Sequence, residues 1–448
     1  MTTLAGKNIV VVGAGLSGLA VCRHAVAAGA EVVLSDRRSA EQIQGLESLD
    51  EQVQRDLGGH SEDLFRRADL IVISPGVPLT VPVLAKAIER GTPVWGEVEY
   101  AFRHLSAPII AITGTNGKST TTELVGAMLR GCGKRVFVGG NIGVPLIEAA
   151  GHDFDYVVVE LSSFQLETIE RFHPRYALML NVSVDHLDRY PDMAAYVAAK
   201  QAIFRNQRAE DVAVLNGEDS LVMAMAKEIA SRKLIFSSRQ LLSEGISFDQ
   251  GLIHWRNKDD EFHFDSADLQ LQGLHNIENV MAALVPVLLE GCDAGQAWQA
   301  ACQFGGLPHR MVLVRTLNGV RWYNDSKGTN LGSVEKSVGG LPAPVTLIAG
   351  GKDKGGDYRD IRAALQGRVT ALVLIGQAAD LMEQAWGDLC PIYRADSMEQ
   401  AVAVAHEVTP SPGQVVLSPG CSSFDMFTSF EDRGNRFAAA VQALPTKE

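Results

Sequence analysis

The sequence feature that most constrains the fold is a glycine-containing turn that joins an apolar run to a helical pattern. Residues 109–113 are apolar up to Thr113, and residues 123–129 carry apolar side chains at helical spacing. The turn between them consists of Gly114, Thr115, Asn116, Gly117, Lys118, Ser119 and Thr120. Glycine lets a backbone approach a polyphosphate closely, and a helix N-terminus attracts negative charge. The sequence therefore predicts a strand, a phosphate-binding loop that contacts a nucleotide triphosphate, and a helix.

Two side chains of this turn have the chemistry that a nucleotide triphosphate needs. Lys118 supplies a mobile cation for the β- and γ-phosphates, and Ser119 supplies a hydroxyl for Mg²⁺. The loop is shorter than the general pattern, because the position five residues before Gly117 is Ile112 and the glycine stands at Gly114. An ordinary strand, turn and helix with an exposed lysine is the alternative interpretation.

The N-terminal segment carries a second glycine-rich turn. Gly13, Gly15 and Gly18 lie between an apolar run and a helical pattern, and an apolar run that ends at Asp36 follows. These spacings are typical of a βαβ unit that binds a diphosphate, with the acidic residue on a ribose hydroxyl. NAD, FAD and a UDP-sugar all fit this pattern, and a turn without a ligand is the alternative. A further loop, which contains Gly76, follows the next apolar run at the edge where such sheets bind ligands.

Several polar side chains of the middle segment stand at strand ends or on helices. Glu160 ends an apolar run, where a carboxylate can reach a Mg²⁺ beside the phosphate loop, and a solvated glutamate is the alternative. His186 follows the next strand, although an isolated histidine is more often a structural group. Lys200 lies on the apolar face of a helix, and periodicity alone favours a stem that reaches water. Asn276 and Asn279 lie three apart on a later helix, where they could cap the helix or meet a base.

The C-terminal segment also has the pattern of a parallel α/β sheet. Apolar strands that alternate with helical stretches are expected at 345–348, 371–375 and 415–417. Polar loops beside these strand ends are expected at 324–330, 350–354 and 418–424. Lys327, Lys354 and Ser423 would gather there as an anion-binding edge, although the loop residues are also ordinary turn formers.

The whole chain therefore belongs to the α/β class, with three domains. We expect a Rossmann-like domain at 1–96, a central P-loop ATPase-like parallel sheet at 97–306 and a second Rossmann-like domain at 307–448. Hydrophobic residues make up 46% of the 448 residues and charged residues 21%, as in ordinary globular proteins. The net charge of −13 argues against a nucleic-acid surface, which needs a basic face.

Cysteine usage and hydropathy predict the compartment. The six cysteines show neither a C-x-x-C pair nor zinc-like spacing, so we expect buried thiols in a reducing compartment. The longest apolar stretch contains Pro286 and is shorter than the ~20 residues that a membrane span requires. We therefore expect a cytoplasmic protein that does not enter a membrane.

Taken together, these parts resemble the Mur ligases of peptidoglycan synthesis over nearly the whole chain. The short phosphate loop is similar to this family's version of the P-loop. Further blocks similar to the family lie at 139–143, 160–166, 185–190 and 307–311. The loop at 324–330 is similar to that of the members that add D-glutamate.

The resemblance implies a role for each candidate site residue. It implies catalytic roles for Lys118, Lys200, His309 and Lys327. It adds Asn276, Asn279, Arg310 and Asp325 to the ATP contacts of the loop. It implies that the UDP-linked substrate is bound by Gly15, Leu16, Ser17, Asp36, Gly76, Asn141, Ser162 and His186. It implies that D-glutamate is bound by Thr329, Lys354, Ser423, Phe424 and Phe430. It implies that the metal is held by Ser119, Glu160, His186 and Lys200, the last as a carbamate.

The resemblance also implies a reaction. An ATP-dependent ligase of this family would add D-glutamate to UDP-N-acetylmuramoyl-L-alanine through an acyl phosphate. It would use two Mg²⁺ sites, in which Mn²⁺ is also possible, and we expect a monomer whose partners are small molecules. Closure of the third domain would bring the nucleotide and amino-acid sites together. Two alternatives are a nicotinamide-dependent oxidoreductase and a P-loop ATPase that acts as a regulatory module.

Overall fold

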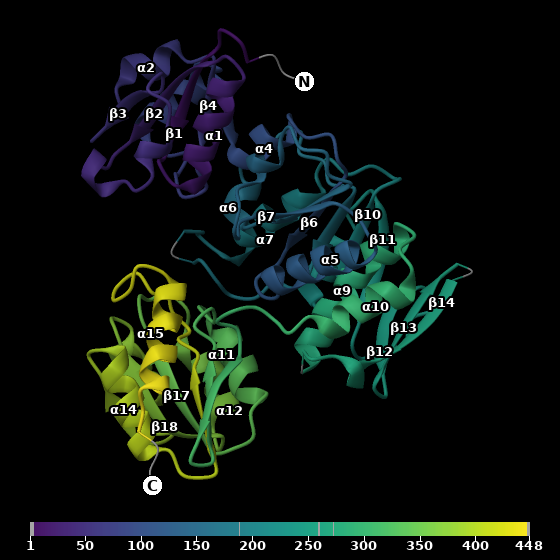
Figure 1. Ribbon diagram of the computed structural model, residues 1–448, viewed down its shortest axis with the longest axis vertical. Coiled ribbons are helices and arrows are strands. Elements are labelled where there is room, and N and C mark those ends of the chain that lie inside the picture. The colour runs from purple at the N-terminus through teal and green to yellow at the C-terminus, as the bar shows by residue number, and fades with distance from the viewer. Residues whose placement is uncertain (1–3, 188, 259, 272, 446–448) are drawn as a thin grey trace. The chain divides into compact units, whose positions relative to one another are not determined.

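The computed structural model describes residues 4–187, 189–258, 260–271 and 273–445, and these form three β-sheets covered by helices (Figure 1). The α/β class predicted from the sequence is confirmed. The chain divides into two compact units, each of which is continuous in space but not in sequence. One unit contains residues 1–182, 196–269 and 276–304, and the other contains 183–195, 270–275 and 305–448.

The first sheet belongs to the N-terminal segment, and its strands are all parallel in the order β3-β2-β1-β4-β5. The strands are β1 (Asn8–Val12), β2 (Glu31–Asp36), β3 (Gln54–Leu57), β4 (Leu70–Ile73) and β5 (Val94–Gly96). The helices are α1 (Leu16–Ala27), α2 (Glu62–Arg67) and α3 (Pro82–Glu89). Val10 and Ile71 pack against Phe65 of α2 and Leu84 of α3, so alternation along the strands turns the intervening side chains to the other face. The predicted βαβ unit is confirmed, whereas the sequence patterns missed β3.

The second sheet is centred on the phosphate loop, because β6 lies between β8 and β9 in the order β14-β13-β12-β11-β10-β9-β6-β8-β7. Its strands are β6 (Ile109–Thr113), β7 (Val136–Gly140), β8 (Tyr156–Glu160), β9 (Tyr176–Met179), β10 (Val212–Asn216), β11 (Arg232–Ser237), β12 (Gly245–Asp249), β13 (Leu252–Asn257) and β14 (Asp260–Asp265). The pairs from β7 to β12 are parallel, and β12, β13 and β14 form antiparallel hairpins. The register places Glu160 beside Ile112, so β6 and β8 deliver their ends to one edge.

The helices of the middle segment include the helix that follows the phosphate loop. They are α4 (Glu97–Phe102), α5 (Lys118–Gly131), α6 (Ser163–Leu166), α7 (Met193–Gln201), α8 (Ser220–Met225), α9 (Leu274–Leu289) and α10 (Ala294–Gln303). The predicted helix after Lys118 is confirmed, and so are the hairpins between residues 212 and 272, but α8 within that stretch was not expected. Among the described residues, no helix combines the length and apolar character needed to cross a bilayer.

The third sheet has the order β15-β16-β20-β17-β18-β19, and it is parallel except for the β15–β16 hairpin. Its strands are β15 (Val312–Leu317), β16 (Val320–Asn324), β17 (Val345–Gly350), β18 (Val369–Ile375), β19 (Ile392–Arg394) and β20 (Gly413–Leu417). Its helices are α11 (Leu331–Gly339), α12 (Arg362–Leu365), α13 (Ala379–Trp386), α14 (Met398–Val408) and α15 (Phe430–Gln442). The three predicted strands are confirmed, and the hairpin was missed.

Alternation along the strands gives this sheet two separate cores. Leu347 and Leu374 pack with α11 and α13 on one face, whereas Ile348 and Val373 pack with α14 and α15 on the other. Figure 1 shows α14 and α15 on one side of β17 and β18, and α11 and α12 on the other. Helices on both faces leave the strand ends and their loops as the place for a ligand.

Short 3₁₀ turns and the cysteines complete the description. The turns are η1 (Ala40–Gln42), η2 (Leu46–Ser48), η3 (Leu146–Ala149), η4 (Ala202–Phe204), η5 (Ser266–Asp268) and η6 (Tyr358–Ile361). All six cysteines are free thiols, but only Cys22, Cys292 and Cys421 are buried. The expectation of buried thiols is therefore wrong for Cys132, Cys302 and Cys390, which are partly exposed.

Candidate active site

The phosphate loop needs glycine at two positions because of its backbone and its neighbours. Gly114 has a φ of +151°, and a Cβ there would lie 3.1 Å from the Cβ of Leu180. Gly117 has a φ of +87°, and a Cβ there would lie 2.3 Å from Asn279 Oδ1. The displaced glycine noted in the sequence is therefore the residue that lets the loop lie against the segment after β9.

The loop leads directly into α5, whose first turn is suited to an anion. Gly117 is the N-cap and no side chain of the described residues caps it, while the first N–H groups of a helix have no acceptor within the helix. Lys118 Nζ donates to the carbonyls of Gly114 at 3.0 Å and Thr115 at 2.9 Å, so this cation lies over the loop. Ser119 is buried in the same turn. Backbone donors, a cation and a hydroxyl therefore meet at one helix end.

Glu160 is a buried carboxylate at the same edge of the sheet. Only 2% of its surface is exposed, and its Oε1 accepts a hydrogen bond from Asn141 Nδ2 at 2.8 Å. Its Oε2 has no hydrogen-bond partner within the described part of the chain. A buried anionic oxygen without a partner is costly unless a cation compensates it, and carboxylate oxygen is a preferred ligand of Mg²⁺. Glu160 therefore fits the metal-binding role that the sequence predicted.

Lys200 does not reach water, so the interpretation that periodicity alone favoured is wrong. The side chain is 2% exposed, and Nζ donates to the Gly114 carbonyl at 2.7 Å. Nζ also lies 4.7 Å from the centre of the Tyr196 ring, and the Tyr196 hydroxyl lies 3.2 Å from Thr115 Oγ1. Helix α7 thus directs Lys200 and Tyr196 into the phosphate loop.

The predicted metal ligands are distributed over both units. Ser119, Glu160 and Lys200 belong to the unit with the phosphate loop, and His186 belongs to the other. In the described parts of the chain, no group of three or more His, Cys, Asp or Glu side chains is placed to hold a metal ion. The metal set therefore stays a prediction, for which the unpaired oxygen of Glu160 is the structural support.

Asn279 and Asn276 connect α9 to the helix of the phosphate loop. Asn279 Oδ1 accepts from the Thr121 hydroxyl at 3.3 Å, and its Nδ2 donates to Asn276 Oδ1 at 3.3 Å. Asn279 is also the residue that excludes a side chain at Gly117. Their predicted contact with ATP is untested, but Asn279 packs directly against Gly117 of the loop, and Asn276 supports it through Asn279.

The N-terminal glycine turn has room on one side and tight packing on the other. A Cβ at Gly18 would lie 1.9 Å from the Gly13 carbonyl oxygen, whereas Cβ atoms at Gly15 and Gly76 would meet no described atom within 4 Å. Ser17 is partly exposed, and Leu16 is 73% exposed although it is apolar. The turn thus leaves an open face where a diphosphate could approach.

Asp36 fixes this turn with a charged carboxylate. It accepts the N–H of Ala14 at 2.7 Å and pairs with Arg38 at 2.8 Å. Burial acts to raise the pKa of Asp36, but Arg38 and the backbone donors together lower it to about 2. Asp36 is therefore ionised, and the ribose contact predicted for it remains a prediction. Ser162, another predicted substrate contact, caps α6 through the N–H of Gln165.

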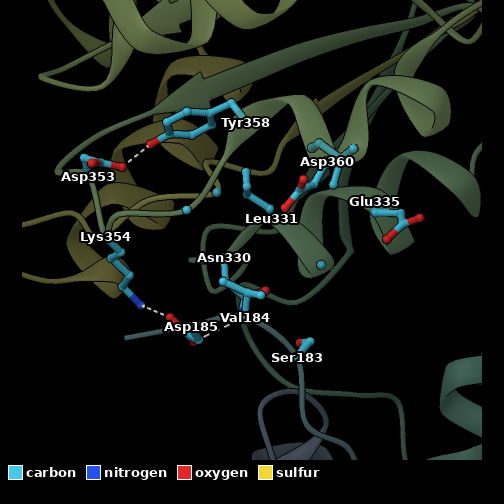
Figure 2. Close-up of a pocket in the computed structure, with 14 residues that line it drawn as sticks. Ser183, Val184, Asp185, Asn330, Leu331, Glu335, Asp353, Lys354, Tyr358 and Asp360 are labelled. Atoms are coloured by element: carbon cyan, nitrogen blue, oxygen red, sulfur yellow. Dashed lines mark hydrogen bonds and ion pairs between the residues drawn. The ribbon is translucent and has the colours of Figure 1, made fainter. Parts of the chain in front are cut away.

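The other unit contains a pocket of about 180 Å³ with a lysine at its edge. Figure 2 shows Lys354 pointing toward Asp185, and their charged atoms lie 3.5 Å apart. Lys354 Nζ lies 3.4 Å from Thr329 Oγ1, and Asn330 Nδ2 donates to Asp185 Oδ2 at 3.2 Å. The wall also contains the carboxylates of Glu335, Asp353 and Asp360. The structure thus brings two of the predicted D-glutamate residues together: Lys354 lines the pocket, whose wall carries both signs of charge, and Thr329 contacts Lys354.

A second group of predicted residues surrounds Phe430. Lys327 Nζ lies 5.4 Å from the centre of the Phe430 ring, and the His309 ring lies 6.3 Å from it. The N–H of Lys327 donates to the His309 carbonyl at 3.0 Å. Burial, assisted by the charge of Lys327, lowers the pKa of His309, although Glu431 opposes the shift. A neutral imidazole is therefore favoured beside a lysine.

The remaining predicted residues of this unit differ in exposure. Ser423 is buried, whereas Phe424 is 71% exposed. Asp325 is enclosed and accepts from the Ser337 hydroxyl at 2.6 Å and the Ser418 hydroxyl at 2.9 Å. Burial raises the pKa of Asp325, and the charge of Arg310 opposes this effect. The predicted contacts of Asp325 and Arg310 with ATP stay predictions.

The sequence patterns missed several side chains that build these surroundings. The missed residues are Asn181, Asp185, Tyr196, Asn330 and Arg433. Asn181 lies two residues after the apolar strand β9 (Tyr176–Met179), so its position at the ligand edge of the sheet was an available signal. Arg433 gave no such signal, because its burial and its bonds to the carbonyls of Ser326 and Cys421 depend on distant segments.

The fold and these sites define an α/β protein with a phosphate loop of the nucleotide-binding type and a separate pocket whose wall carries both signs of charge. Three family descriptions match the chain. They are "Mur ligase MurD-like, N-terminal domain" at 7–96, "Mur ligase middle domain" at 112–287 and "Mur ligase, glutamate ligase domain" at 309–421.

Full-length relatives give the same result. A UDP-N-acetylmuramoylalanine--D-glutamate ligase from Syntrophotalea carbinolica is 56% identical over 446 residues and covers 99% of each chain. One of the same name from Geotalea uraniireducens is 49% identical over 98% of each chain. This chain belongs to the Mur ligase family, as the resemblance of its motifs implied.

Solved structures of lower identity share the fold. A pseudomurein peptide ligase type C from Methanothermus fervidus has a TM-score of 0.64 at 17% identity and covers 97% of this chain and 99% of its own. A UDP-N-acetylmuramate-alanine ligase from Thermotoga maritima has a TM-score of 0.61 at 20% identity, with 98% and 99% coverage. At these identities the likeness concerns the fold alone.

Proposed function

We propose that this protein is an ATP-dependent acid–amino-acid ligase that adds D-glutamate to UDP-N-acetylmuramoyl-L-alanine during peptidoglycan precursor synthesis. The observation that carries the proposal is the phosphate loop, where the Gly114 carbonyl receives the side chains of both Lys118 and Lys200. A phosphate loop with the Lys118 cation and a buried lysine that can become a metal ligand suits the transfer of a phosphoryl group. The names of the relatives supply the substrate, and the pocket at Lys354 supplies a place for an amino acid.

Each segment has its own part in this proposal. Residues 1–96 bind the UDP part through the open glycine turn, with Gly15, Leu16, Ser17, Asp36 and Gly76 as contacts. Residues 97–306 bind ATP, and residues 307–448 bind D-glutamate. These boundaries are proposals of the same rank as the residue roles, because the two compact units follow a different division.

The amino-acid pocket has the charges that D-glutamate requires. An amino acid carries an ammonium group as well as a carboxylate, and D-glutamate carries a second carboxylate. Lys354, with the hydroxyl of Thr329 at 3.4 Å, suits a carboxylate. Asp185 and the acidic wall suit the ammonium group before it loses a proton and attacks. Ser423, Phe424 and Phe430 would complete the contacts.

The residues that surround the loop also fit Mg²⁺. Glu160 offers its unpaired Oε2, Ser119 a hydroxyl, and Lys200 an oxygen ligand once CO₂ has converted its amine to a carbamate. His186 would contribute from the other unit. Two Mg²⁺ ions, or Mn²⁺ in their place, would neutralise charge on the phosphate oxygens of ATP.

The reaction then needs two bond-forming steps. The carboxylate of the acceptor attacks the γ-phosphorus of ATP, which forms an acyl phosphate and releases ADP. The amine of D-glutamate attacks the acyl carbon, and the tetrahedral intermediate expels phosphate. Lys118 and Lys327 stabilise the negative charge, and the neutral His309 orients the acyl phosphate. Most of the catalysis is positioning and charge neutralisation.

A coupled phosphate-release assay with a panel of amino acids tests the proposal. With ATP, Mg²⁺ and UDP-N-acetylmuramoyl-L-alanine present, we expect sustained phosphate release with D-glutamate and little with L-glutamate or D-alanine. ADP formation that does not depend on D-glutamate would instead favour a regulatory ATPase. Tighter binding of NADH than of UDP would favour the oxidoreductase alternative. A cytoplasmic location and a monomeric state remain predictions.

A further inference from the structure

The segment that follows β9 is hydrogen-bonded to the phosphate loop. Asn181 Oδ1 accepts the N–H of Asn116 at 2.8 Å, and Asn181 Nδ2 donates to the Asn116 carbonyl at 3.0 Å. The carbonyl of Asn181 accepts the N–H of Thr115 at 2.9 Å. A single residue therefore pairs with two neighbouring residues of the loop, and its side-chain amide binds both backbone groups of one of them.

Asn181 can approach the loop closely because Gly114, which has no side chain, precedes Thr115 and Asn116. A Cβ at Gly114 would lie 3.1 Å from Leu180 Cβ and 3.3 Å from the backbone N and O of Asn181. The carbonyl of Gly114 in turn receives Lys118 at 3.0 Å and Lys200 at 2.7 Å. The Thr115 and Asn116 backbone groups that Asn181 binds therefore follow directly after the Gly114 carbonyl, which accepts hydrogen bonds from both lysines.

We propose that Asn181 is a positioning residue for the ATP site, which holds the phosphate loop in its binding conformation before nucleotide arrives. A loop with glycine at two of four positions has a large conformational freedom, and ordering it at the moment of binding would reduce affinity. The paired amide bonds remove this freedom in advance. This inference rests on the proposed role of the loop in binding ATP, and it assigns a role to a side chain that the motif itself does not contain.

A neighbouring asparagine provides a matched control. Asn216, at the end of β10, is also buried, and its Nδ2 donates to the Leu180 carbonyl at 2.8 Å. Its Oδ1 accepts the N–H of Glu218 at 2.9 Å. Asn216 therefore supports the same strand end through the residue before Asn181, and its two bonds lead to Leu180 and Glu218 rather than to the loop.

The test compares Asn181→Asp, Asn181→Ser and Asn216→Ala in the full-length protein. Asn181→Asp retains the shape and the acceptor for the Asn116 N–H, but it turns a carboxylate oxygen toward the Asn116 carbonyl. Asn181→Ser is a milder change, because a serine is too short to span both groups. The measurements are ADP affinity by calorimetry with Mg²⁺, the KM for ATP and for D-glutamate, kcat, and the thermal midpoint.

We expect both Asn181 variants to weaken ADP binding and raise the KM for ATP by about tenfold or more, as the loss of a paired hydrogen bond would. The KM for D-glutamate should change by less than about twofold, and Asn216→Ala should lower the thermal midpoint with ADP affinity within about twofold of wild type.

Three results would overturn the inference: unchanged ADP affinity in Asn181→Asp, an equal loss in Asn216→Ala, or failure of both Asn181 variants to fold. A wild-type protein that binds neither ATP nor ADP would overturn the proposed function itself, so the two failures are distinguishable.

Discussion

At the scale of single residues, the burial of Lys200 is the finding that sequence periodicity did not predict. An amine on the apolar face of a helix could have extended to water, but Nζ lies 2.7 Å from the Gly114 carbonyl and only 2% of the side chain is exposed. Burying a cation is costly, so the buried position of Lys200 favours a chemical role for its amine. Conversion to a carbamate would give the site an anionic oxygen beside Glu160 and Ser119, as the proposed metal site requires.

We expect Lys200→Ala to lower the ligase rate by about 100-fold or more, the usual scale for the loss of an electrostatic group that stabilises a transition state. Formate, acetate or bicarbonate should restore part of that rate, because a free carboxylate can occupy the vacated position. The measurement is phosphate release with and without the added anion. Lys227→Ala, which removes an exposed lysine, is the control and should keep wild-type activity. Full activity of Lys200→Ala would contradict the carbamate role.

A second residue-scale prediction concerns Glu97, the first residue of α4. The side chain is 2% exposed, its Oε1 accepts the N–H of Ile147 at 2.8 Å, and burial raises its pKa from 4.5 to about 7. The backbone donors lower that pKa, and the charge of Glu148 raises it further. The folded state therefore holds the Glu97 proton more tightly than the unfolded state does. The associated stability is fully present below pH 4.5 and is lost as the pH rises through about 7.

We expect Glu97→Gln to remove this pH-dependent loss of folding stability, because glutamine does not ionise. The full shift of the Glu97 pKa corresponds to about 3 kcal/mol of stability. The variant should become more stable relative to wild type as the pH is raised from about 5 to about 8, in the window that the Glu97 shift defines. Thermal midpoints measured at both pH values give the comparison. Glu89→Gln, at an exposed position of α3, should show the same pH dependence as wild type. Parallel curves for wild type and Glu97→Gln would refute the shift.

At the scale of elements, the strand–loop–helix unit depends on glycine for two different reasons. A positive φ is one, and contact with a neighbouring segment is the other. Gly117 combines a φ of +87° with a contact of 2.3 Å to Asn279 Oδ1, whereas Gly133, just beyond the other end of α5, has a φ of +77° and no described atom within 4 Å of its Cβ position. A substitution at Gly133 therefore tests backbone strain alone, whereas one at Gly117 tests strain together with the steric conflict with Asn279.

We expect Gly117→Ala to abolish measurable nucleotide binding, because the new methyl group would displace Asn279 and deform the loop. Gly133→Ala should only lower stability, by about 1 kcal/mol, the usual cost of a left-handed conformation at a residue with a side chain. ADP calorimetry and thermal unfolding of both variants provide the comparison. Equal ADP affinity in the two variants would show that the Asn279 contact is unimportant.

At the scale of the whole molecule, the proposed reaction needs groups from both compact units. Lys118, Glu160 and Lys200 belong to one unit, and His309, Lys327 and Lys354 belong to the other. In the proposed reaction the acyl carbon of the activated acceptor must meet the amine of D-glutamate, so the proposal requires the units to come together during catalysis. Domain closure that completes a catalytic site is a common means of excluding water.

We expect a non-hydrolysable ATP analogue with Mg²⁺, the UDP-linked acceptor and D-glutamate to make the protein more compact in solution. Small-angle X-ray scattering of the free and fully liganded protein measures this as a smaller radius of gyration. Lys354→Ala, which we expect to weaken amino-acid binding, should reduce the change at subsaturating D-glutamate. An unchanged radius at saturation with every ligand would contradict closure.

Much of the fold could be predicted because its signals are local. The apolar runs of β1, β6, β8 and β18 and the glycine turns after β1 and β6 lie within short stretches of sequence, and the structure confirms them. The short β3 and the β15–β16 hairpin were missed, because β3 is polar and half-exposed and the hairpin is stabilised by pairing with β20. The edge strands β3 and β15 depend on their neighbours more than on their own composition.

The sequence by itself determined the α/β class, the phosphate loop, the glycine positions and the family, because these follow from residues that are contiguous or regularly spaced. Only the tertiary structure decided that Lys200 is buried against the Gly114 carbonyl, that Asn181 pairs with Asn116, and that Glu160 has an oxygen without a hydrogen-bond partner among the described residues. The first two contacts join residues that are 86 and 65 positions apart. No local pattern encodes such a distance, since it is the order of strands in the sheet that brings these loops to one edge.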